Sequence, residues 1–227
     1  MTLTVNSSTC APSKTSEFLQ QSIYVILGFP TVVANLIVLY VIARSGKFRL
    51  LGFLAVGDTV YGGAYFVSGM VRLYYLAQGT YHCPRSRANC LLAPWFHLFA
   101  LGNFWPPVGR LLVCADRVIA VGFVSWYHQH WSAAKERKLM VAAAFLLVIC
   151  ISPAYLISAI NPTGTLTKRQ CPFSHVNHTY STFYSMFGFI SGMLSVIANL
   201  YALTAAKYQF AKLGLPETDS YIKDKKD

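Results

Sequence analysis

The chain has 227 residues, of which 55% are apolar and only 12% are charged. A soluble domain normally carries about twice that share of charged residues, so a water-soluble protein of this size is not expected. The hydrophobicity also excludes a disordered chain. Nineteen Lys and Arg against eight Asp and Glu give a net charge of +11. No run of basic residues is interleaved with aromatic residues in the way that suits nucleic acid, so no nucleic-acid partner is expected.

Five stretches of the sequence are long enough to cross a bilayer, whose core of about 30 Å requires roughly 20 apolar residues. Three contain no charge, one contains Asp58, and one ends directly before Arg110. Together they take up 110 of the 227 residues, more than the connecting segments could cover in a soluble fold. We therefore expect an all-α, polytopic transmembrane helix bundle in contact with membrane lipid, with spans at Ser22–Ala43, Leu50–Val71, Leu91–Gly109, Leu139–Ile160 and Thr182–Ala206.

The distribution of Lys and Arg around these spans predicts their orientation, because cytoplasmic ends are enriched in both residues. One side carries twelve of them and the other six. The richer side is predicted to be cytoplasmic, which places residues 1–21 outside as an N-terminal segment, residues 22–206 in the membrane domain and residues 207–227 inside as a tail. The twelve are Arg44, Lys47, Arg49, Arg117, Lys135, Arg137, Lys138, Lys207, Lys212, Lys223, Lys225 and Lys226.

Two further patterns agree with an outside N-terminus. Asn6 and Asn177 each begin an Asn-x-Ser/Thr glycosylation motif, and both fall in segments assigned to the outside. Four cysteines also fall outside, where thiols oxidise. They are candidates for disulfides whose pairing the residues alone leave open: Cys10, Cys83, Cys90 and Cys171.

Three motifs on the first three spans carry a family resemblance. Asp116-Arg117-Val118 at the inner end of the third span resembles the Asp-Arg-Tyr signature of rhodopsin-like G-protein-coupled receptors. Asp58 closes a Leu-Ala-x-x-Asp motif, and Asn35 lies in a segment similar to the family's Gly-Asn-x-x-Val. The departures from the family pattern include Val118 in place of tyrosine. The loose match resembles the divergent serpentine chemosensory receptors of nematodes.

The resemblance implies a seven-helix receptor fold in the plasma membrane, of which this chain holds five spans, as a form truncated before the last two helices. It implies a heterotrimeric G protein as partner of a full-length or complemented receptor, and no cofactor. Cys90 and Cys171 match the disulfide at the family's outer face. The implied pocket for an unknown small-molecule or peptide ligand lies in the outer half of the third span, at His97, Phe99 and Asn103.

Asp58 and Arg110 are expected to form an ion pair inside the membrane. Asp58 lies eight residues into the second span and Arg110 seven residues above Arg117, so both are about 10 to 12 Å deep at 1.5 Å per residue. A charge buried in the bilayer is costly, which makes pairing the natural solution, with Asn35 as a further polar group. The alternatives are a protonated Asp58 bonded to a neighbouring helix and an Arg110 that extends to the inner surface.

Other activities find little support in the residues. No nucleophile is placed beside a base and no Gly-rich phosphate loop is present, so an enzyme is not expected. His128 and His130 are two residues apart, which does not place both on one helix face for a metal. Two rivals to the receptor interpretation remain. One is a non-signalling partner that forms dimers with full-length receptors, and the other is a small transporter or channel.

Overall fold

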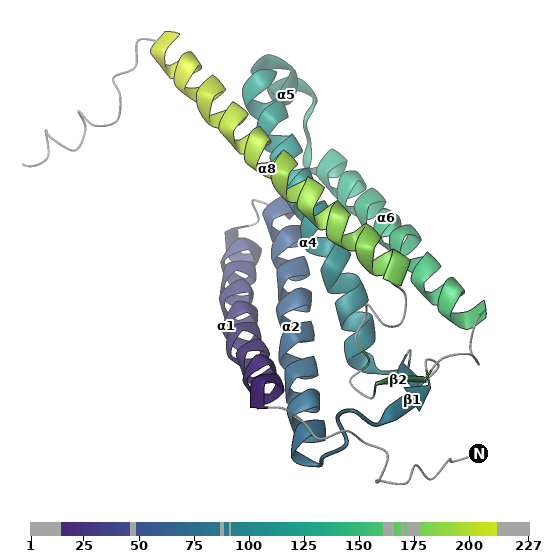
Figure 1. The fold of residues 1–227 in the computed structure, drawn as a ribbon. Coiled ribbons are helices and arrows are strands. Elements are labelled where there is room, and N and C mark those ends of the chain that lie inside the picture. Colours follow the sequence, from purple (N-terminus) through teal and green to yellow (C-terminus); the bar gives the residue numbers. More distant parts are fainter. Residues whose placement is uncertain are drawn as a thin grey trace, which may run out of the picture.

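The structure is a computed structural model. It describes residues 15–45, 49–86, 89–90, 92–160, 166–168, 171 and 178–212, without the side chains of residues 85, 86, 154, 157–160, 166–168, 178–180 and 209–212. In these residues the chain forms six helices and two short strands (Figure 1). In chain order they are α1 (Thr15–Ser45), α2 (Arg49–Ala77), β1 (Pro84–Ser86), α4 (Pro94–Gly122), α5 (Val124–His130), α6 (Ala133–Ile160), β2 (Leu166–Lys168) and α8 (His178–Lys212).

Local sequence explains where two of the helices begin and end. Pro94 begins α4, where its missing N–H is not needed and its fixed φ suits the first turn. Beyond the end of α2, Gly79 has a φ of +66° and donates to the carbonyl of Leu76, while Thr80 donates to that of Tyr75. This left-handed glycine satisfies carbonyls that the helix end leaves open and turns the chain toward β1.

Four of the described helices are long and apolar enough to cross a membrane: α1, α2, α4 and the Ser181–Tyr208 part of α8. Their outward faces carry large apolar side chains, and Phe189 of α8 is 67% exposed. Prolines stand inside α1 at Pro30 and inside α4 at Pro106 and Pro107. Interior prolines are tolerated in membrane helices more readily than in soluble ones. The chain is therefore a polytopic helix bundle whose long helices are built for contact with lipid.

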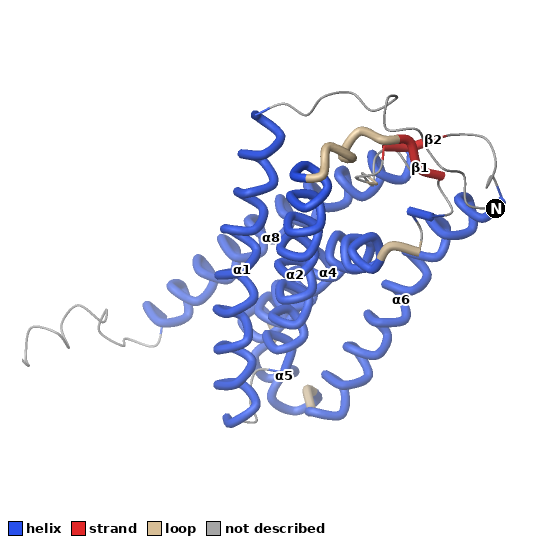
Figure 2. The backbone as a smooth tube through the Cα atoms, turned by 90° about the horizontal axis from the view of Figure 1, so that it is seen from below, coloured by secondary structure: helices blue, strands red, loops and turns tan. Residues whose placement is uncertain are grey.

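Helix α4 lies at the centre of the packing, in contact with α2, α6 and α8, while α1 packs on α2 (Figures 1 and 2). One core cluster joins α4 to α6 through Phe104, Val108, Leu147 and their neighbours. Helices α2 and α4 also meet closely, because Gly57 leaves room for the indole of Trp105. That indole Nε1 donates to the carbonyl of Phe53 over 3.0 Å.

One end of the bundle, here called the outer end, is closed by β1 and β2; α5 lies at the opposite, inner end (Figure 1). The two strands pair antiparallel, with Pro84 opposite Lys168. The first turns of α1 hold the loop before β1. Glu17 contacts His82 at 2.9 Å, and the amide of Gln21 donates to the hydroxyl of Tyr81 over 3.3 Å.

Four of the predicted spans lie within observed helices, and the third, Leu91–Gly109, is helical from Pro94 onward. Helix α1 begins at Thr15, inside the predicted N-terminal segment, because the polar residues before Ser22 continue the helix. Helix α4 continues past Gly109 through Arg110, although the charge of Arg110 ends the apolar stretch. The fifth predicted span, Leu139–Ile160, is helical within α6. Its crossing of the membrane stays a prediction, as does the orientation of the whole chain.

Candidate functional site

The inner end of α4 carries Asp116 and Arg117, and each has a different partner. The hydroxyl of Tyr127 donates to Oδ1 of Asp116 over 2.9 Å. Tyr127 stands on α5, which follows α4 after a single residue and turns back toward it. Burial, and then the bond to Asp116, raise the pKa of the Tyr127 phenol. The phenol therefore remains a donor, and Asp116 fixes α5 against α4.

Arg117 is exposed, and its Nη1 donates to the side-chain oxygen of Asn199 on α8 over 3.1 Å. The Nδ2 of Asn199 in turn donates to the carbonyl of Ser195 over 2.9 Å and lies 3.7 Å from the sulfur of Cys114. This cluster joins α4 to α8 near their inner ends. The resemblance implies that Asp116 restrains Arg117, but no ion pair between them occurs in the described residues, because each has taken another partner.

Val118, the third residue of the motif, has an apolar side chain that forms no hydrogen bond. It lines a groove of about 470 Å³ between α4 and α8, together with Leu111, Ala115, Ile197 and Tyr201. The groove is apolar and lies beside the cluster of Arg117 and Asn199. The inner end thus combines an exposed cation with an apolar groove between the same two helices.

The structure does not assemble the predicted intramembrane site from Asn35, Asp58 and Arg110. Asn35 donates to the carbonyl of Thr31 in its own helix over 2.9 Å. Arg110 is close enough to act electrostatically on Asp58, but within the described residues the two make no ion pair. Instead Nε of Arg110 donates to the carbonyl of Pro106 over 3.4 Å, one turn back along α4. The side chain thus turns along its own helix, which corrects the expected direct pair.

Arg110 and Asn103 line the same cavity, of about 360 Å³, between α2, α4 and α8. Tyr61, Tyr184 and Ser185 add hydroxyl groups to its wall. Of the three predicted pocket residues, only Asn103 lines this cavity. A cavity between three helices, with an amide, a guanidinium and hydroxyl groups in its wall, can take a small ligand with hydrogen-bonding groups.

The other two predicted pocket residues lie nearer the outer end and pack against neighbours. The ring of His97 stacks on that of Tyr155 at 5.5 Å, and its Nδ1 is 2.6 Å from the Tyr155 hydroxyl. Phe99 packs edge-on against Tyr65 at 5.3 Å. Both therefore contribute to contacts between helices, and the three residues do not form one pocket.

Arg72 is a residue that the sequence interpretation missed. It directly follows the predicted second span, but it lies within α2, five residues before the end of the helix, and only 9% of it is exposed. Its guanidinium lies 5.8 Å from the centre of the Phe99 ring, which suits a cation–π contact. The aromatic residues that follow it, Tyr74 and Tyr75, could have indicated that the helix continues beyond Val71 and encloses Arg72.

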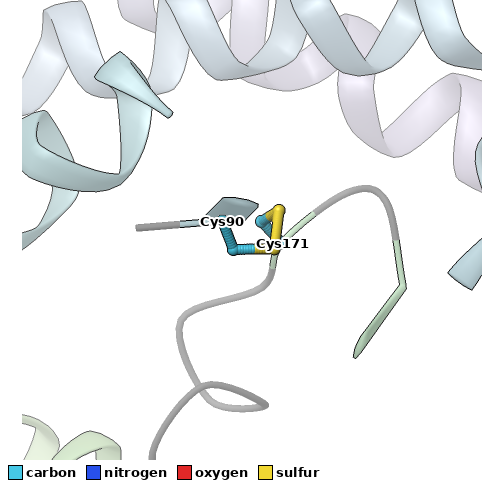
Figure 3. Close-up of a disulfide and its surroundings, with 2 residues drawn as sticks. All are labelled: Cys90 and Cys171. Carbon is cyan, nitrogen blue, oxygen red and sulfur yellow. A yellow bond between two sulfur atoms is a disulfide. The ribbon is translucent and has the colours of Figure 1, made fainter. Parts of the chain in front are cut away.

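Cys90 and Cys171 form a disulfide at the outer end, as the resemblance implies (Figure 3). Their Cα atoms are 5.5 Å apart, within the usual range, and the bond closes 81 residues. Both cysteines are buried with Trp95 and Phe96 in a second core cluster. Cys83 also takes part in a disulfide. Asn6 and Asn177, the predicted glycosylation sites, lie outside the described residues.

Comparison with known proteins gives no family for this chain. No protein-family model matches the sequence, and no curated protein matches it either. The chain is therefore a multi-helix protein with four helices suited to crossing a membrane among its described residues.

Proposed function

We propose that the chain forms the first five helices of a rhodopsin-like receptor and that the inner ends of α4 and α8 bind a heterotrimeric G protein. The observation that carries this proposal is the environment of Arg117. Its guanidinium is exposed and is held by the neutral amide of Asn199. Asp116 is meanwhile bonded to Tyr127. The full positive charge of Arg117 is therefore available to a partner.

The groove beside Arg117 supports the same partner. Its wall is apolar on both α4 and α8 and contains Val118 and Tyr201. A helix end of the G protein would place apolar side chains in this groove. Its last carbonyl groups, which carry the negative end of the helix dipole, would face Arg117.

The ligand of such a receptor would occupy the cavity at Asn103 and Arg110. This cavity touches α2, α4 and α8, and α4 and α8 are also the helices that meet at Arg117. A ligand that draws α8 toward α4 at the cavity would change their spacing at the inner end, which is how binding at one site biases another. The ligand class follows from the wall: a small molecule with hydrogen-bonding groups and an apolar body.

Energy transfer in living cells tests the proposal as binding of the G protein and not as its activation, for which the resemblance implies a full-length or complemented receptor. The chain would carry a luminescent donor after Asp227, and a panel of Gα subunits would carry the acceptor. We expect a saturable signal with at least one Gα, reduced several-fold by Arg117→Ala and retained by Arg44→Ala, an exposed arginine at the inner end of α1. Surface expression is measured for every variant. A signal with every Gα that is independent of Arg117, or no saturable signal at all, overturns the proposal.

A further inference from the structure

A shallow groove runs along one face of α6, lined by Ala134, Arg137, Lys138, Val141, Ala142 and Phe145. These positions follow one another at spacings of three, one, three, one and three residues, which places them on a single helix face. The face changes character along its length. It is basic in the first turns of α6, at Arg137 and Lys138, and apolar from Val141 onward.

The basic end of the groove has no carboxylate partner within the described residues. Nε of Arg137 donates to the carbonyl of Ala133 in its own helix over 3.4 Å, and both cations are exposed. The described ion pair lies at the other end of the bundle. Glu136 directly precedes Arg137 in sequence, but it does not line the groove, and it acts electrostatically on Tyr127 of α5.

The surroundings of the basic end are those of a membrane interface. Nη1 of Arg49 donates to the carbonyl of Ala133 over 3.3 Å, which adds a cation from α2. The Lys135 ammonium lies 6.0 Å from the Trp126 ring, and that ring stacks on His130 at 5.4 Å. Tryptophan and clustered Lys and Arg are the residues that gather at a leaflet rich in anionic lipid.

The apolar end continues the groove along α6, away from the basic residues. Val141 is 70% exposed and Phe145 is 68% exposed, although both are large apolar residues. Phe145 lies seven residues beyond Lys138, which is about 10 Å along the helix. A ligand that satisfies both ends must carry a negative group at one end and an apolar chain of at least that length.

We propose that this face of α6 binds an anionic phospholipid. Its phosphate accepts hydrogen bonds from Arg137 and Lys138, and one acyl chain lies along Val141 and Phe145. A soluble anion would fill only the basic end, and a zwitterionic lipid would bring a positive group next to two cations. The site is separate from the proposed G-protein site at Arg117. The bound lipid would hold α6 and α5 at a leaflet that contains negative lipids.

Native mass spectrometry of the full chain in an uncharged detergent tests this proposal. The chain is mixed with phosphatidylserine or with phosphatidylcholine of the same acyl chains. We expect phosphatidylserine to bind more tightly. Each cation near an anionic surface contributes roughly a fivefold gain, so Arg137→Gln with Lys138→Gln should weaken binding about 25-fold. The charge-conserving exchange Arg137→Lys with Lys138→Arg should retain most of the affinity for phosphatidylserine.

Two controls make the test specific to the groove. Arg44→Gln with Lys207→Gln removes the same charge from exposed ends of α1 and α8 and should leave binding within about twofold. Glycerophosphoserine, which has the headgroup without chains, should not displace the lipid at tenfold excess. Equal binding of both lipids, an equal loss in the control variant, or displacement by glycerophosphoserine overturns the proposal. Circular dichroism verifies that each variant keeps its helix content.

Discussion

The guanidinium of Arg117 and the side-chain oxygen of Asn199 are 3.1 Å apart, which joins α4 to α8 across 82 residues of sequence. The amide nitrogen of Asn199 is bonded to the carbonyl of Ser195, so the oxygen is held in position for Arg117. A neutral acceptor leaves the arginine its charge, whereas a carboxylate would neutralise it. The inner ends of the two helices are thus linked by a hydrogen bond that leaves the positive charge of Arg117 unneutralised.

A double-mutant cycle measures this link. Arg117→Ala and Asn199→Ala should each lower the stability of the chain in detergent, and the two losses should not add. The coupling energy should be about 0.5 to 1.5 kcal/mol, the size found for hydrogen bonds between membrane helices. Asn35→Ala is the matched control, since Asn35 bonds only within its own helix in the described contacts. Additive losses for Arg117 and Asn199 would show that the contact contributes no stability.

Close approach of α1 to α2 depends on Gly28. A methyl group there would lie 2.7 Å from the backbone nitrogen of Phe66 and 2.8 Å from the carbonyl oxygen of Gly62. Because backbone atoms cannot move aside singly, Gly28→Ala should force the helices apart and lower the unfolding free energy by about 1 to 3 kcal/mol. A Cβ at Gly63 would meet nothing within 4 Å, so Gly63→Ala should change stability by less than about 0.5 kcal/mol. Thermal unfolding compares the two, and similar losses would contradict the predicted contact.

The disulfide at the outer end should stabilise the bundle. Closing 81 residues is worth about 4 kcal/mol in the chain-entropy model. Cys90→Ser and Cys171→Ser should therefore lower stability by similar amounts, and the double variant should cost no more than either one. Peptide mapping without reduction should recover Cys90 with Cys171 and place Cys83 in a different linked peptide. A Cys83–Cys90 peptide would contradict this pairing.

Tyr127 fixes α5 through its bond to Asp116. Tyr127→Phe should loosen α5, with a loss of about 1 kcal/mol and faster hydrogen exchange in Val124–His130. The raised pKa of the phenol gives this effect a pH dependence. The folded state holds the proton more tightly than the unfolded one, so the contribution is fully present below the ordinary tyrosine pKa of about 10 and declines as pH rises toward the folded-state value. Unchanged exchange at neutral pH would exclude a role for the bond.

The helices were largely predictable from the sequence, because membrane spans depend on length and apolarity, and both can be read from the sequence. Their ends were less predictable. Arg110 and Arg72 each ended a predicted span, yet both lie inside helices. A charge ends an apolar stretch without ending the helix, since the backbone bonds continue and aromatic neighbours or a cavity accommodate the side chain.

Side-chain partners could be predicted only in part. Asp58 and Arg110 stand at similar depth, but depth leaves open which way each side chain turns around its helix. Arg110 turned back along α4 to the carbonyl of Pro106. The bond between Arg117 and Asn199 joins residues 82 positions apart, and nothing in either local sequence indicates the other. The pair Cys90 and Cys171 could be anticipated only because a family resemblance supplied it.

The side of the membrane on which α5 lies is the most direct test, because both proposals require it to be cytoplasmic. His128→Cys introduces a thiol on exposed α5 at the inner end, and Gln78→Cys introduces one at an exposed position just beyond the outer end of α2. Each variant is treated with a membrane-impermeant maleimide in intact and in permeabilised cells, with the unchanged chain as background. We expect Gln78→Cys to react in intact cells and His128→Cys to react only after permeabilisation. Reaction of His128→Cys in intact cells would place Arg117 and the α6 groove outside and contradict both proposals.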